Sequence, residues 1–175
     1  IGICSQRIDA IRDALSPATV RVRRDPRIAG AEHYRLLIEP DGITVLSGTD
    51  AGAYYGLQTL RERVRSGGAD LAAVRIDDAP DFARRGLYLD CSRGKVPTVD
   101  TLKQLIEKLA HWKMNELQLY IENVFAFRRH PAISRGYDPF TVDDLLDVQA
   151  HAARHHVTFV PSLASFGHME RVLGL

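Results

Sequence analysis

Polar side chains stand shortly after three apolar runs in the second half of the sequence. Arg93 and Glu122 follow the first two runs, and His168 comes soon after the third. A guanidinium offers five donors in a rigid fork, which suits it to gripping vicinal hydroxyls or a carboxylate. A glutamate close to a histidine can fix the tautomer and the orientation of the ring. These residue types predict a site that binds and orients a polar ligand, provided that the fold brings them together.

Each of these residues also has a plain structural interpretation. An arginine near a strand end more often forms a surface salt bridge than a ligand contact, and Glu122 could cap its loop or pair with Arg128. A loop histidine such as His168 is more often solvated than catalytic. Spacing alone therefore favours the salt bridge for Arg93, and it leaves a structural and a functional role open for Glu122 and His168.

Other kinds of catalytic site have no signature in the sequence. We find no His/Cys cluster with metal-ligand spacing, no Gly-rich phosphate loop and no GxSxG elbow, so neither a metal nor a cofactor is expected. Paired carboxylates for direct attack on a glycosidic bond are also missing from the three apolar run ends.

The charge balance bears on the partners. With 23 Lys and Arg against 22 Asp and Glu the net charge is +1, so we expect a neutral ligand, no nucleic acid and no membrane partner. No apolar run approaches the roughly 20 residues that cross a bilayer. Cys4 and Cys91 form no disulfide framework, and the first residues lack a signal-peptide pattern, which slightly favours a cytoplasmic location and leaves the compartment open.

The elements of the second half explain how the three polar ends could meet. The apolar runs predict strands at residues 86–90, 117–121 and 157–161. Helical spacing of apolar residues from Leu102 to Leu109 predicts a helix after the first strand, with Trp112 in the core, and Thr141 with Asp144 predicts the capped start of a second helix. This β-α-β-α-β order calls for a parallel sheet, in an open doubly wound fold or in a barrel. Ligands bind outside the carboxyl ends of such strands.

The first half follows a different pattern. Apolar spacing between Ile8 and Leu15 predicts a helix, and residues 19–22 a short strand. Runs at 34–39 and 43–46, joined by Pro-Asp-Gly, predict a β-hairpin, and Asp50 is expected to cap the helix that follows. We therefore predict an α/β protein with a small α+β domain at 1–79 and a second domain at 80–175.

Several segments resemble glycoside hydrolase family 20, the β-N-acetylhexosaminidases. The likeness covers nearly the whole chain beyond about residue 33, in the order and spacing of that family. The segments that carry it most specifically are Tyr55-Gly56-Leu57-Gln58-Thr59, Ile76-Asp77-Asp78-Ala79-Pro80 and Leu89-Asp90-Cys91-Ser92-Arg93.

The resemblance implies a fold, a reaction and a substrate. The second domain would be the start of a (β/α)₈ TIM barrel, incomplete in this chain. The family removes terminal N-acetylglucosamine or N-acetylgalactosamine from glycans with retention: the acetamido group of the substrate attacks the anomeric carbon, held by an Asp, and a neighbouring Glu protonates the leaving oxygen. That Asp-Glu pair follows the fourth strand and this chain ends after the third, so the chain alone is expected to be inactive.

Three residues match family positions. Arg93 is similar to the arginine that binds sugar hydroxyls, and Glu122 with His168 resembles a supporting acid-histidine pair. The family run Asp-Asp-Gln-Gly-Trp after the second strand is here Glu-Asn-Val-Phe-Ala, and Phe166 replaces the Pro of a Pro-Gly-His segment. These departures bear on sugar specificity.

Two other functions stay open beside the glycosidase. One is a catalytically silent carbohydrate-binding protein on the same scaffold, since fold does not fix function. The other is a general α/β domain whose polar strand ends are structural. Because three parallel strands cannot close a barrel, we also expect self-association through the exposed edge of the last strand.

Overall fold

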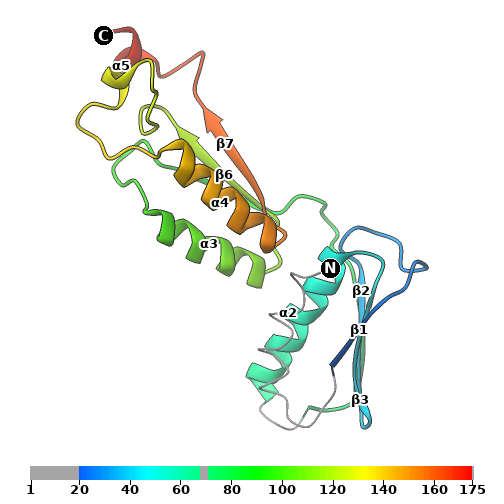
Figure 1. The fold of residues 1–175 in the computed structure, drawn as a ribbon. Helices are drawn as coiled ribbons and strands as arrows, with labels where there is room; N and C mark the ends of the chain where they lie inside the picture. The colour runs from blue at the N-terminus through cyan, green and yellow to red at the C-terminus, as the bar shows by residue number, and fades with distance from the viewer. Residues whose placement is uncertain (1–19, 68–70, 175) are drawn as a thin grey trace. The chain divides into compact units, whose positions relative to one another are not determined.

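The computed structural model describes residues 20–67 and 71–174, and the chain divides between Ala83 and Arg84 into two compact units (Figure 1). The helix predicted between Ile8 and Leu15 lies outside the described residues. No described helix combines the length and the apolar character needed to cross a membrane.

The first unit contains a four-stranded sheet. Its strands are β1 (Val20–Arg24), β2 (Tyr34–Glu39), β3 (Gly42–Ser47) and β4 (Val74–Asp78), in the order β1-β3-β2-β4. The predicted hairpin is confirmed as the antiparallel pair β2 and β3. Gly42 closes its turn with a φ of 147°, a backbone conformation that glycine tolerates best. Strand β4 was not predicted, because it is short and its pairing partner β2 is distant in sequence.

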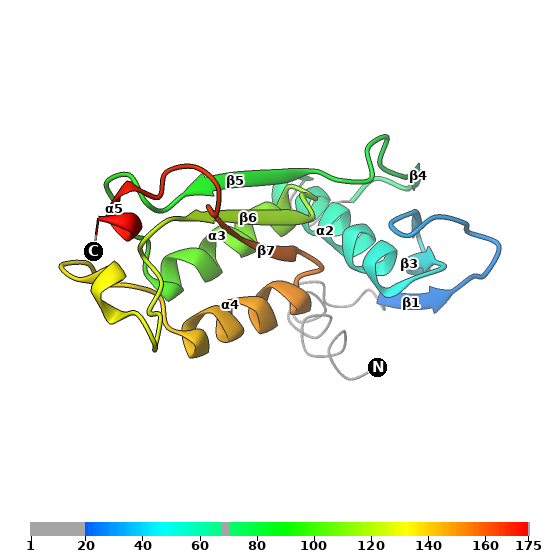
Figure 2. The ribbon, with the colours of Figure 1, turned by 90° about the horizontal axis from the view of Figure 1, so that it is seen from above.

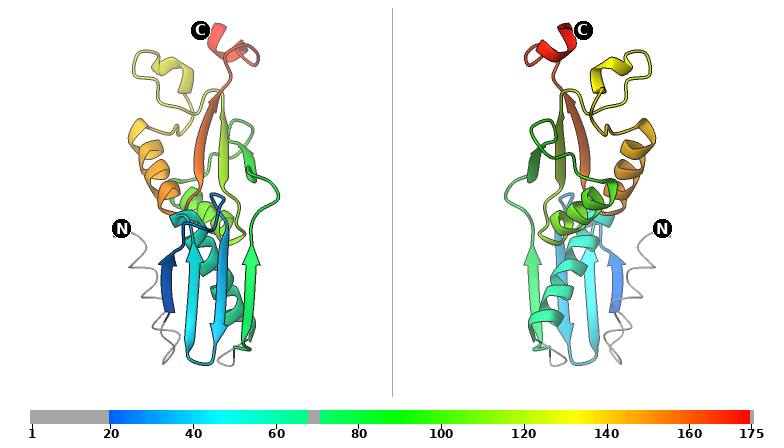
Figure 3. Two further views of the ribbon diagram at one scale, coloured as in Figure 1. Left: turned by 90° about the vertical axis from the view of Figure 1, so that its right-hand side faces the viewer. Right: turned by 90° about the vertical axis from the view of Figure 1, so that its left-hand side faces the viewer.

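Helix α2 (Asp50–Gly67) packs on one face of this sheet (Figure 3). Leu57 and Leu60 are buried against the apolar side chains of β2 and β3, as their helical spacing predicted. The predicted cap at Asp50 is wrong: Thr49 caps the helix, since its hydroxyl accepts a hydrogen bond from the Gly52 N–H at 3.0 Å. Glycine is needed at position 52, because a Cβ there would lie 2.4 Å from the carbonyl oxygen of His33.

Asp77→Asn is expected to lower the pKa of His33. His33 Nε2 lies 2.5 Å from Asp77 Oδ1, and its Nδ1 lies 2.9 Å from the carbonyl oxygen of Ala29. The hydrogen bond to Asp77 is the largest reason that the pKa of His33 is raised above 6.5. A raised folded pKa means that the pair stabilises the unit fully below the unfolded value of about 6.5, and that this contribution disappears as the pH rises through the folded value.

An NMR titration of the histidine ring signals measures this change directly. The matched control is Asp41→Asn, which removes an exposed carboxylate from the turn between β2 and β3. A His33 pKa that is the same in Asp77→Asn and in the unmodified protein would contradict the expected link.

The second unit has the predicted β-α-β-α-β order. Strands β5 (Gly86–Asp90), β6 (Glu116–Ile121) and β7 (Thr158–Leu163) form a parallel sheet in the order β5-β6-β7. Helices α3 (Val99–His111) and α4 (Val142–Arg154) connect them and lie side by side on one face of the sheet (Figure 2). Short helices η1 (Pro131–Ser134) and α5 (Glu170–Leu173) complete the unit.

The start of α4 was predicted from the sequence, whereas the cap of α3 at Thr98 and the end of α3 were not. Thr141 and Asp144 form the predicted capping box, and Thr98 accepts a hydrogen bond from the Thr101 N–H at the start of α3. Trp112 was predicted in the core, but it is 64% exposed. It is the C-cap of α3, and the chain turns with a positive φ at Lys113, so the indole leaves the buried face of the helix.

Among the described strands, β7 pairs only with β6, and the backbone of Pro161 lies on its unpaired edge. The N–H groups of Thr158 and Ala164 donate to carbonyls at the two ends of β6. Backbone groups alternate in direction along a strand. The open edge is therefore faced by the backbone N–H positions of Phe159, Pro161 and Leu163. Proline has no N–H, so this edge lacks a donor at its middle position.

Candidate functional site

The carboxyl ends of β5 and β6 bring Arg93 between two carboxylates. Arg93 Nη1 donates to Asp90 Oδ2 at 2.5 Å, and Nη2 donates to Glu122 Oε1 at 2.7 Å. The guanidinium carbon also lies 5.5 Å from the centre of the Tyr120 ring. The plane of the guanidinium is thus fixed by its partners, while the Arg93 side chain remains 51% exposed. It is held in place and still open to a ligand.

Glu122 is the least exposed member of this cluster. Its carboxylate accepts from Arg93 and also from the Tyr120 hydroxyl at 3.0 Å, and its side chain is 16% exposed. Its backbone N–H donates to Ser92 Oγ at 2.7 Å, which ties the end of β6 to the loop after β5. The pairing with Arg128 that the sequence left open is not the one found: Glu122 pairs with Arg93.

His168 meets the same two side chains from the segment after β7. Its Nδ1 lies 3.9 Å from Glu122 Oε1 and 3.3 Å from Arg93 Nη2. The sequence predicted that Glu122 and His168 approach each other, and these distances confirm it. His168 has a positive φ of 56° and a side chain that is 63% exposed, so its ring reaches the cluster from the solvent side.

Electrostatics keep Asp90 and Arg93 charged at neutral pH. Burial opposes ionisation of Asp90, but hydrogen bonds from the Ser92 N–H and from Arg93 outweigh it, and the pKa of Asp90 is lowered from 3.8. The hydrogen bond to Asp90 is the largest reason that the pKa of Arg93 is raised. Burial, followed by the hydrogen bond to Glu122, raises the pKa of Tyr120 above 10.0, so the phenol keeps its proton.

The sequence did not assign roles to Asp90 and Tyr120, although their spacing carried a signal. Asp90 stands three residues before Arg93, and Tyr120 stands two residues before Glu122 and so shares its face of β6. The parallel register places Asp90 directly beside Tyr120. The salt bridge that spacing favoured for Arg93 is present in the structure, and it is compatible with ligand binding because the guanidinium has further donors.

The charges and the nearby thiol limit the chemistry. Two acidic side chains surround one guanidinium in the cluster, which favours an uncharged or cationic ligand over an anionic one. Cys91 is 1% exposed, and burial raises the pKa of its thiol to about 11, so it offers no thiolate nucleophile. The cluster is suited to hydrogen-bonding hydroxyl groups.

The long loop after β6 is closed at its base. Phe125 and Phe140 form an isolated parallel bridge, with N–H donations from Ala126 to Phe140 O and from Phe140 to Val124 O, both at 2.9 Å. Phe125 and Phe127 meet edge to face, with ring centres 4.9 Å apart. Two aromatic residues of this loop therefore pack on each other beside the loop base.

Parallel strands alternating with helices, with a hydrogen-bonding cluster at the strand ends, define an α/β unit of the kind whose ligand sites lie at the carboxyl ends of the strands. Residues 7–79 match the family model "Glycosyl hydrolase family 20, domain 2", and residues 82–174 match "Glycosyl hydrolase family 20, catalytic domain". The chain belongs to glycosyl hydrolase family 20.

Curated relatives and solved structures agree with this assignment. A β-N-acetylhexosaminidase of Cellulomonas fimi is 32% identical over 88% of this chain and 34% of its own length. The Streptomyces plicatus N-acetyl-β-hexosaminidase in complex with thio-NAglucal superimposes with a TM-score of 0.80 at 27% identity, over 97% of this chain and 41% of that one. A mutant of the same enzyme was solved with its product, GlcNAc.

The chain spans only part of the length of the curated relatives it matches, for example 34% of the Cellulomonas fimi enzyme and 26% of the β-hexosaminidase B of Pseudoalteromonas piscicida. This coverage and the structural likeness confirm the predicted fold class, an α/β protein that contains the start of a barrel.

Proposed function

We propose that this chain supplies the sugar-recognition edge of a β-N-acetylhexosaminidase that removes terminal N-acetylhexosamine by substrate-assisted, retaining hydrolysis. The observation that carries the proposal is the Arg93 guanidinium held between Asp90 and Glu122 at the carboxyl ends of β5 and β6. A fork fixed in this way can donate to two neighbouring hydroxyls of a terminal sugar without losing its orientation.

Glu122 and His168 act in this proposal as positioning residues. The Glu122 carboxylate holds one Nη group of Arg93 and the Tyr120 hydroxyl, and His168 covers the same Nη group from solvent. Preformed contacts of this kind reduce the entropy lost when a ligand binds. The acid and the acetamido-holding carboxylate lie elsewhere in the barrel under this proposal, since Asp90 and Glu122 are both engaged with Arg93.

The test uses a polypeptide that carries this chain together with a complete barrel. We expect turnover of about 1 to 10³ per second on a chromogenic N-acetyl-β-glucosaminide. The matching β-glucoside, which lacks the acetamido group, is expected to give no detectable turnover because it has no internal nucleophile. Equal hydrolysis of both would overturn the proposed mechanism, and sugar binding without hydrolysis would identify the carbohydrate-binding alternative.

A further inference from the structure

Two histidines and a glutamate converge between α3 and α4, on the helical layer of the second unit. His151 Nε2 lies 3.3 Å from Glu107 Oε1, and His155 Nε2 lies 4.0 Å from the same oxygen. One ligand atom from each of the three residues can be chosen so that all lie within 4.8 Å of one another. The two imidazoles stack with ring centres 4.6 Å apart. Both Nε2 atoms therefore face one carboxylate oxygen.

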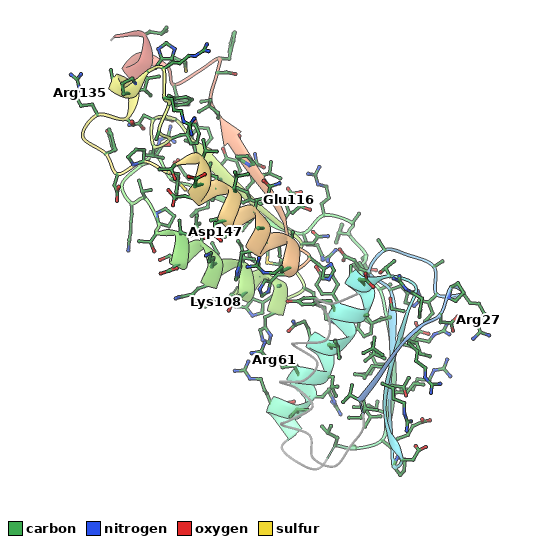
Figure 4. The ribbon with its side chains drawn as sticks, in the orientation of Figure 1. Arg27, Arg61, Lys108, Glu116, Arg135 and Asp147 are labelled. Atoms are coloured by element: carbon green, nitrogen blue, oxygen red, sulfur yellow. The ribbon has the colours of Figure 1, made fainter. Side chains whose placement is uncertain are left out.

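The packing of the two helices fixes this convergence. His151 and His155 are four residues apart on α4, which puts them on one face of the helix, and they are 9% and 1% exposed. One turn earlier on each helix, Lys103 Nζ and Asp147 Oδ2 form an ion pair at 2.6 Å. Figure 4 labels Asp147 on α4 and Lys108 on α3, next to the site on both helices. The register that joins 103 to 147 also joins 107 to 151.

We propose that Glu107, His151 and His155 bind a divalent transition-metal ion of the Zn²⁺ class and so tie α3 to α4. Metal–ligand bonds of about 2.0 to 2.2 Å in a tetrahedron separate the ligand atoms by roughly 3.4 Å. The distances of 3.3 and 4.0 Å to Glu107 Oε1 lie on either side of this value, and rotation of the two stacked imidazoles would direct both Nε2 lone pairs at one ion. Two imidazoles and one carboxylate suit Zn²⁺, whereas Ca²⁺ and Mg²⁺ prefer oxygen ligands.

The fourth coordination position would be open to solvent. The Glu107 side chain is 50% exposed, while the two imidazoles lie below the surface. Three protein ligands with an open fourth position allow the ion to exchange with the medium.

Arg154 opposes metal binding because it holds the His151 ring through a hydrogen bond. Its Nη2 lies 3.2 Å from His151 Nδ1, so the guanidinium donates to that atom and the neutral ring carries its proton on Nε2. A metal bound at Nε2 requires the proton on Nδ1, which ends this hydrogen bond. Arg154 is exposed and can turn away. Arg154→Ala should therefore bind the metal more tightly than the unmodified protein, an effect that no purely structural role of the cluster explains.

The experiment is a calorimetric titration of the protein with ZnCl₂, followed by a Co²⁺ titration that reports coordination by its visible spectrum. We expect one ion per chain. Each of three substitutions should weaken Zn²⁺ binding: Glu107→Gln, His151→Gln and His155→Gln. The expected loss exceeds about 10-fold, the lower end of what is lost when a residue that only hydrogen-bonds to a metal ligand is removed. His130→Gln, which removes an exposed loop imidazole, is the matched control and should bind as the unmodified protein does.

Absence of saturable Zn²⁺ binding, or equal affinity in the unmodified protein and in Glu107→Gln, overturns the proposal. Glu107→Gln decides the matter if a histidine variant fails to fold, because it changes a half-exposed carboxylate to an amide of the same shape. The measurement needs no sugar and no catalytic turnover, so it stands apart from the proposed glycosidase activity.

Discussion

Arg93→Ala is expected to lower kcat/KM for an N-acetyl-β-glucosaminide by about 10- to 150-fold in a polypeptide that carries this chain and a complete barrel. The range corresponds to about 1.5 to 3 kcal/mol for a charged hydrogen bond to the sugar. The substitution also leaves Asp90 and Glu122 without the cation that both contact in the structure. Steady-state kinetics with the chromogenic substrate measures the effect.

Two variants show whether the fork or only the charge matters. Arg93→Lys keeps the charge but cannot span both carboxylates in one plane, so we expect an intermediate loss. Arg84→Ala removes a 77% exposed arginine that pairs with Glu116 near the opposite ends of β5 and β6, and it should leave kcat/KM unchanged. If Arg93→Ala folds and retains full kcat/KM, the assignment of Arg93 to the sugar is wrong.

The 175-residue chain by itself is expected to give no turnover on the same substrate. At the ends of the three parallel strands that the structure describes, Asp90 and Glu122 are the carboxylates of the cluster, and both hold Arg93. The reaction needs one carboxyl group to hold the acetamido group and another to protonate the leaving oxygen. Neither residue is available for these tasks without releasing the arginine.

A chromogenic assay of the purified chain checks this expectation, with the Arg93→Ala chain assayed beside it. Turnover that is present in the first and lost in the second would show that the chain is itself catalytic. Equal residual turnover in both would point to a contaminating glycosidase, because the cluster would then play no part.

The parts of the site that depend on parallel topology could be predicted from the sequence. Once the strand at 86–90 and the strand at 117–121 are parallel neighbours, Arg93 and Glu122 must lie at one edge, and His168 joins them from the next strand. The choice of Arg93 rather than Arg128 as the partner of Glu122 could not be predicted, because the path of the loop after β6 decides which arginine the glutamate meets.

Other features depend on contacts that a linear pattern does not contain. Thr49 rather than Asp50 caps α2 because the helix starts one residue earlier than the charge pattern indicates. The cluster of Glu107, His151 and His155 was not predicted, because Glu107 lies 44 residues before the first histidine and only the packing of α3 on α4 joins the three. Trp112 has an apolar ring, yet it is exposed because it lies at the C-terminal end of α3.

Pro161 affects strand pairing at the open edge of β7 while a barrel of this kind is being synthesised. A ribosome adds about 5 to 20 residues per second, so three strands wait for seconds before a fourth is available. During that interval the open edge of β7 could template a strand from a neighbouring nascent chain on the same messenger. With no N–H at its middle position, that edge offers a poor template. Because Pro161 leaves this edge of β7 without one donor, cross-pairing of nascent chains at the edge is less favourable.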